Sequence, residues 1–215
     1  MSVTQPLPSN TDVSNLAAAI VKWQETWTRL WHESEDKVMP PTPFFRTIQF
    51  EHRRNFDLWH EEDKARSPGA TPEQIGSYKR RIDKLNQERN DLIEQLDEGY
   101  LTMLVQRKVQ APPDAPWNTE TPGSATDRLS IIALKIFHMR EQEERTDATE
   151  SHREKCHAKR LTLERQRADL AAALQILIDE LFEGKKQMKL YRQFKMYNDP
   201  SLNPEIYKHG PNKTS

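Results

Sequence analysis

The chain has 215 residues, of which 33 are acidic and 32 are basic, so its net charge is −1. This balance excludes a global electrostatic field that would steer nucleic acid or an anionic membrane toward the protein, and we expect no nucleic-acid partner. The single cysteine, Cys156, excludes a domain that is stapled by internal disulfides.

The first residues, MSVTQPLPSNTDVSN, lack the basic segment and the apolar run of a signal peptide. The most apolar stretches, LSIIALKIF and LAAALQILI, are too short to span a bilayer. These features predict a cytoplasmic protein with no membrane span. Along the chain we expect a disordered segment over 1–11, a single helical-bundle domain over 12–204 and a flexible segment over 205–215.

Clusters of proline divide the chain into periodic segments, and no stretch shows the period-2 alternation of a strand. The sequence therefore predicts an all-α protein. Its long helices are expected at 12–35, 43–66, 72–108, 122–146 and 149–185.

Three of these helices begin at a threonine that is followed by proline. The threonine hydroxyl can accept a hydrogen bond from a free backbone N–H of the first turn, and proline has no N–H to leave unpaired. Helix starts are therefore predicted at Thr42-Pro43, Thr71-Pro72 and Thr121-Pro122. Gln74 completes a capping box with Thr71.

The segment KQMKLYRQFKMYNDP, residues 186–200, predicts a short helical tail. Its aromatic residues Tyr191, Phe194 and Tyr197 would share one helical face, which we expect to dock on the bundle. The alternative is that this face binds a partner, because basic and aromatic residues alternate along it.

The helices over 72–108 and 149–185 each carry a leucine seam with the alternating spacing of three and four that is typical of coiled-coil packing. Each seam has an arginine at one position where the spacing predicts an apolar residue: Arg89 in the first seam and Arg167 in the second. An offset of 78 residues superimposes the two arginines, and the two seams with them.

The same offset places His60 on His138 and Thr71 on Thr149. We therefore predict two pseudo-repeated αα-hairpins, about 43–109 and 122–186, which together form a four-helix bundle. The helix over 12–35 would pack on the outside of that bundle.

Hairpins that face each other would bring functional groups of both halves to the bundle centre. In the stretch NFDLWHEEDKAR, Asn55 and Glu62 lie on one helical stripe, and His60 and Asp63 lie on the next. The candidate polar pocket comprises Asn55, His60, Glu62, Asp63, Arg89, His138, Glu141 and Arg167.

Three interpretations of this pocket stay open. In the first, the arginines pair with carboxylates in a structural network, with Glu62, Asp63, Glu141 and Glu144 as the available acids. In the second, the arginines hold a phosphate or carboxylate ligand, and a histidine acts as acid or base. In the third, a metal binds at Asp57-x-x-His60 and Glu154-x-x-His157.

The symmetric Glu-x-x-His pattern of di-metal bundles is broken at Lys135, so we expect no metal and no cofactor. Other catalytic templates, such as a Gly-rich phosphate loop or a His-Glu-x-x-His zinc helix, do not occur in the sequence. Cys156 lies at a seam position, which favours a small core residue over a nucleophile.

Four segments carry a family resemblance: NFDLWHEEDKAR, KRRIDKLNQERNDLIEQLDE, ETPGSATDRLSIIALKIFHMREQEERTD and YRQFKMYNDPSLNP. They resemble the bacterial family filed as domain of unknown function 4254, over about residues 50 to 204. The resemblance implies one helical domain and a loose link to gene neighbourhoods for cell-surface polysaccharide and glycosyl transfer. It transfers no catalytic residue.

These observations favour a protein-interaction or accessory factor, linked to cell-surface glycan assembly through the resemblance. Its partner would be another protein or a second copy of the chain. The alternative is a binder of a small phosphorylated ligand such as a nucleotide sugar, or an enzyme that acts on one, through the His/Arg/carboxylate pocket.

Overall fold

The structure is a computed structural model that describes residues 12–33, 40, 42–194 and 199–208. Over these residues the protein is all-α, as predicted, apart from one isolated bridge between Trp117 and Gln187. The helices are α1 (Leu16–Glu33), α2 (Pro43–Ala65), α3 (Pro72–Gln106), α4 (Pro122–Glu144), α5 (Glu150–Phe182) and α6 (Pro204–Tyr207). None of these helices has an apolar stretch that is long enough to cross a membrane.

The predicted helix starts are confirmed at the level of individual hydrogen bonds. Thr42, Thr71 and Thr121 each accept a bond from the backbone N–H three residues later, and proline follows each of them. The Thr71–Gln74 capping box is present. Local sequence therefore sets the starts of α2, α3 and α4.

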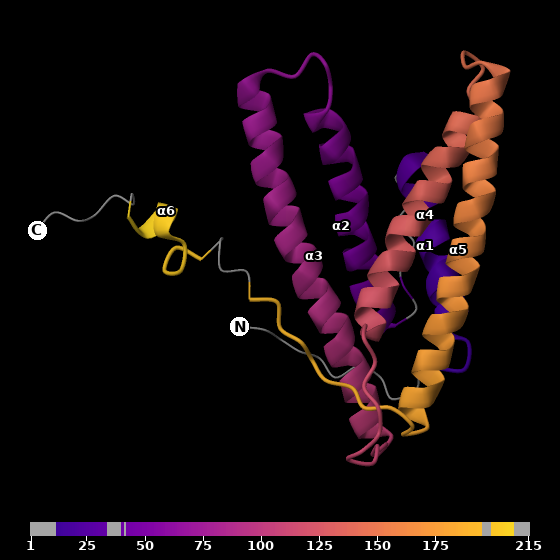
Figure 1. The fold of residues 1–215 in the computed structure, drawn as a ribbon, viewed down its shortest axis with the longest axis vertical. Coiled ribbons are helices and arrows are strands. Elements are labelled where there is room, and N and C mark those ends of the chain that lie inside the picture. Colours follow the sequence, from indigo (N-terminus) through magenta and orange to yellow (C-terminus); the bar gives the residue numbers. More distant parts are fainter. Residues whose placement is uncertain (1–11, 34–39, 41, 195–198, 209–215) are drawn as a thin grey trace, which may run out of the picture.

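The two predicted hairpins are also confirmed. Helices α2 and α3 form one hairpin and α4 and α5 form the other, and Figure 1 shows the two hairpins spreading apart toward their turns. Both first helices have 23 residues, and the second helices have 35 and 33.

Equivalent residues of the two hairpins meet where α2 approaches α4. His52 Nδ1 lies 2.7 Å from Ser130 Oγ, and these residues are 78 positions apart. The rings of His60 and His138, separated by the same 78 positions, have centroids 5.7 Å apart. A residue that contacts its own equivalent indicates a local two-fold axis between α2 and α4.

The predicted place of the N-terminal helix is wrong. Helix α1 contacts α2, α4 and α5, and its Leu16, Ile20 and Trp27 are fully buried in the main core cluster. Helix α1 packs against both hairpins and is part of the core.

The start of α4 is fixed onto α3 by one buried carboxylate. Asp97 Oδ1 accepts a 2.8 Å hydrogen bond from the N–H of Gly123, in the first turn of α4. A Cβ atom at position 123 would lie 2.7 Å from that oxygen and from the carbonyl oxygen of Ile93. The close approach of α3 and α4 therefore requires glycine here.

The prediction of a helix over 186–200 is wrong for the residues that the structure describes up to Phe194. Helix α5 ends at Phe182, and Gly184, with a φ of 71°, follows the cap residue Glu183 in a Schellman motif. The chain then continues without a helix to Phe194, and Arg192 forms ion pairs with Glu94 and Glu98 of α3.

The predicted aromatic docking face does not form either. The exposed fractions are 60% for Tyr191 and 86% for Phe194, whereas Tyr197 lies outside the described residues. The short helical tail is α6, which stands apart from the bundle in Figure 1.

Candidate functional site

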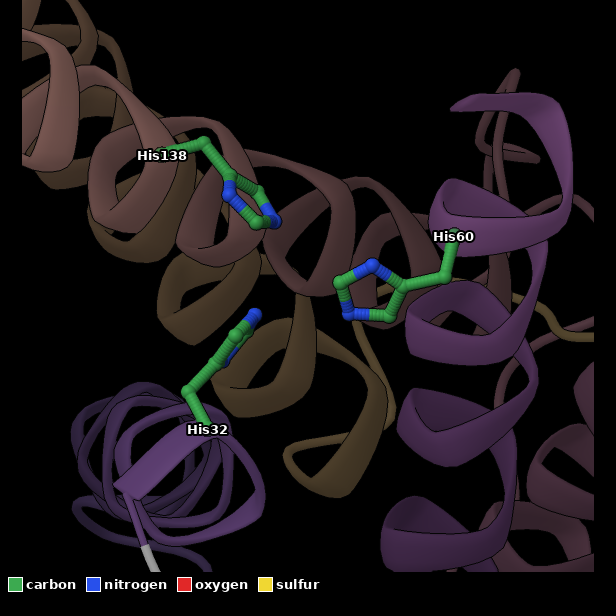
Figure 2. A group of neighbouring side chains, drawn as sticks. All are labelled: His32, His60 and His138. Atoms are coloured by element: carbon green, nitrogen blue, oxygen red, sulfur yellow. The ribbon is translucent and has the colours of Figure 1, made fainter. Parts of the chain in front are cut away.

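Three histidines from three helices converge between the hairpins. His32 lies in the last turn of α1, His60 near the end of α2 and His138 near the end of α4. One ring nitrogen of each lies within 4.8 Å of the other two, and Figure 2 shows the three rings reaching into one common space.

Hydrogen bonds fix which nitrogen of two of these rings carries the proton. His32 Nδ1 lies 2.7 Å from the carbonyl oxygen of Thr28, which can only accept, so Nδ1 is the donor. His138 Nδ1 lies 2.7 Å from Glu141 Oε2 and donates in the same way to the carboxylate. When either ring is neutral, its lone pair is therefore on Nε2.

These two Nε2 atoms are buried, and neither has a hydrogen-bond partner among the residues that the structure describes. A buried nitrogen with an unused lone pair costs free energy unless something binds it. A histidine whose Nδ1 is held by a carbonyl or a carboxylate, with Nε2 free, has the arrangement that protein metal ligands adopt.

Aromatic side chains hold the three rings in place. The ring of Phe137 stacks on His32 at a centroid distance of 4.0 Å, and Trp59 stacks on His138 at 4.6 Å. Phe56 lies edge-on to both His32 and His60. Burial lowers the pKa values of His32 and His60 below the usual value of 6.5, which favours their neutral forms.

A second polar cluster lies deeper between α2, α3 and α4. Asn55 Nδ2 donates to Asp127, to Ser130 and, in a short contact, to Glu51. Arg89 forms an ion pair with Asp127, with 2.8 Å between Nε and Oδ1. Burial and the neighbouring Asp127 raise the pKa of Glu51 well above its usual range, so the neutral acid is favoured.

The predicted convergence of the two arginines does not occur. Arg89 lines a hollow of about 350 Å³ together with Asn55, Glu62 and Asp63. Arg167 lines a different hollow and pairs with Glu25 of α1. The acids that pair with the arginines are Asp127 and Glu25, and none of the four carboxylates proposed for this role does so.

The other candidate residues are distributed as follows. Glu141 holds His138, and Glu62 pairs with Arg66 at the surface. One residue of each predicted metal motif is paired with another side chain: Asp57 forms ion pairs with Arg53 and Arg54, and His157 forms a hydrogen bond with Glu143. Of the predicted pocket, His60, His138 and Glu141 belong to the histidine cluster, and Asn55 and Arg89 belong to the deeper network.

A groove of about 820 Å³ lies beside the cluster, and His138 and Trp59 form part of its wall. The rest of its lining comes from α2, α4 and α5, and includes Asp63, Lys135, Met139, Gln142, Lys159 and Leu163. The histidine cluster therefore lies next to a space that a small molecule can enter.

His32 was not among the predicted site residues, although the sequence holds a signal for it. The tripeptide Leu-Trp-His occurs at 30–32 and again at 58–60, and 136–138 reads Ile-Phe-His. Each histidine of the cluster is the third residue of such a triplet, and two of the preceding aromatic residues, Trp59 and Phe137, stack on another histidine of the cluster. A search for this triplet would have found all three.

No curated protein and no solved structure matches the chain. A family model described as "Protein of unknown function (DUF4254)" matches residues 46–190, a range that includes His60 and His138. Because this match covers more than half of the sequence, the chain belongs to the DUF4254 family.

Proposed function

We propose that this protein binds a divalent transition metal, Zn²⁺ by preference, through His32, His60 and His138. The observation that carries the proposal is the pair of buried Nε2 atoms, on His32 and His138, for which the described part of the chain offers no partner. Zinc accepts neutral imidazole nitrogen at about 2.0–2.1 Å, so each ring would move inward by about 1 Å from its present position.

Three neutral ligands leave the full charge of the ion in place and one coordination position open. Structural zinc sites close that position with a fourth protein ligand, whereas catalytic sites keep it for water or substrate. The ion would therefore supply Lewis-acid chemistry beside the groove. The chain's own contribution is to orient the imidazoles through Thr28 and Glu141, and to shield them with Trp59, Phe56 and Phe137.

Equilibrium dialysis against Zn²⁺, followed by metal analysis, tests this proposal. We expect one zinc per chain in the wild type, and affinity about 100-fold or more lower in each of His32→Ala, His60→Ala and His138→Ala. Glu141→Ala leaves the ligands in place but removes the acceptor for His138 Nδ1, so affinity should fall about 10- to 100-fold.

The matched control is His152→Ala. His152 Nε2 lies 3.4 Å from Cys156 Sγ, so this pair is a rival site for a soft metal. We expect His152→Ala to retain one zinc per chain. If zinc is lost with His152 and retained in the three cluster variants, the proposal is wrong.

An interaction role is a second candidate, and it rests on the C-terminal segment. Large apolar side chains are exposed there, namely Tyr191, Phe194, Leu202, Ile206 and Tyr207. Exposed apolar groups of this kind favour association with a protein or with a second copy of the chain. A link to cell-surface glycan assembly rests on the family resemblance alone.

Light scattering over a range of protein concentrations tests the self-association form of this role. We expect a mass above that of the monomer at high concentration, and a return to the monomer mass in the variant Tyr191→Ser/Phe194→Ser. A wild-type mass that stays monomeric at every concentration would contradict it.

A further inference from the structure

We infer that the groove beside the histidine cluster binds a small organic molecule that carries a phosphate group. This inference rests on the proposed metal site, because the ion would supply part of the positive charge that holds the phosphate. Three features of the groove support it: its cations, its apolar wall and its size.

The cations of the groove are Lys135 on α4 and Lys159 on α5. Both side chains line the groove and are exposed, and among the described residues neither forms an ion pair or a hydrogen bond. Of the described residues that line the groove, Asp63 alone carries a carboxylate. Two ammonium groups and a dication would face two carboxylates, Asp63 in the lining and Glu141 on His138. The remaining charge of +2 favours a ligand with more than one negative charge.

The arginines are unsuited to this role. Arg89 is held by Asp127 and Arg167 is held by Glu25, so an anion would have to displace a carboxylate to reach either guanidinium. The anion-binding role that the sequence suggested for Arg89 and Arg167 therefore suits Lys135 and Lys159 better.

The apolar part of the lining indicates that the ligand has an organic portion. Trp59, Met139 and Leu163 lie in the wall, alongside the amides of Gln142 and Gln166. A volume of about 820 Å³ lies in the usual range of about 300–1,000 Å³ for small-molecule sites and far exceeds the size of a phosphate ion. A phosphate monoester with a planar or apolar group matches both the positive charge and the apolar wall of the groove.

Isothermal titration of the zinc-loaded protein with phenyl phosphate, benzoate and inorganic phosphate tests the inference. Phenyl phosphate should bind at least about tenfold more tightly than either of the other two, because it alone offers both a dianion and an apolar ring. Lys135→Met and Lys159→Met should each weaken phenyl phosphate binding by about tenfold.

The control variant is Lys155→Met, because Lys155 is exposed on the same helix as Lys159 but does not line the groove. Zinc content is measured for every variant. One zinc per chain with equal binding of phenyl phosphate and benzoate, or an equal effect of Lys155→Met and Lys159→Met, would overturn the inference and leave the metal site standing. If the protein binds no zinc but binds phenyl phosphate in a way that depends on the two lysines, the proposed metal site is wrong. The proposal that the groove binds a phosphorylated molecule would then stand without the metal.

Discussion

Replacement of Arg89 by methionine is expected to lower the free energy of unfolding by about 3–5 kcal/mol. The guanidinium of Arg89 is the cation that balances Asp127, whose exposed fraction is 5%. Without the guanidinium, the carboxylate of Asp127 would stay buried beside Glu51, and the amide of Asn55 would remain as a donor to it. Urea denaturation monitored by circular dichroism measures this loss.

The equivalent residue of the other hairpin provides the matched control. Arg167 pairs with Glu25, whose side chain is 48% exposed, so water screens the pair. Arg167→Met should therefore cost at most about 1 kcal/mol. Adding Asp127→Asn to Arg89→Met should recover much of the loss, because the uncompensated charge is removed. Equal losses for the two arginine variants would contradict this account of the buried network.

A second large effect is expected from the pH dependence of Asp97. Burial raises the pKa of Asp97 from 3.8 to about 6, although hydrogen bonds from Thr121 and Gly123 favour the charged form. The folded state thus binds the proton more tightly than the unfolded state. This contribution to stability is complete below pH 3.8 and is lost as the pH rises through 6, for a total of about 3 kcal/mol.

The measurement is the difference in unfolding free energy between Asp97→Asn and the wild type. The neutral asparagine keeps an oxygen for the N–H of Gly123 but does not titrate. Between pH 4 and pH 7 the difference should shift in favour of the variant by about 2 kcal/mol. Comparison with the wild type at each pH cancels opposing contributions such as that of His52, whose pKa is lowered by burial to about 3. A difference that does not change with pH would contradict the raised pKa of Asp97.

The parts of the fold that could be predicted from the sequence are those that neighbouring residues determine. A threonine followed by proline sets the start of α2, and the capping box of Thr71 and Gln74 sets the start of α3, because both devices act within one helical turn. The 78-residue offset predicted the two hairpins because it compares whole segments. The contact between His52 and Ser130 joins two residues that this offset makes equivalent.

The partners of the arginines could not be predicted in this way. Asp127 lies in the first turns of α4 and Glu25 lies in α1, and no local spacing relates either to its arginine. Their pairing depends on how far the hairpins diverge and on where α1 enters between them. The packing of α1 against both hairpins brings His32 to His60 and His138. The repeated triplets mark these histidines in the sequence, but no local spacing predicts that they meet.

In the segment after α5, a local helical pattern predicted a helix that does not form. The segment has a helical spacing of aromatic residues, but Gly184 follows the end of α5 with a positive φ, and Arg192 then holds the chain against Glu94 and Glu98. The ion pairs and the Schellman motif together decide the conformation up to Phe194.

X-ray absorption at the zinc edge, on protein loaded with one equivalent of Zn²⁺, tests the proposed metal site most directly. The proposal predicts three imidazole nitrogens at about 2.0 Å and one further light atom at the open position. The imidazole signal should be lost in His138→Ala and retained in His152→Ala. A sulfur shell at about 2.3 Å would place the ion at Cys156, and so would contradict the site formed by His32, His60 and His138.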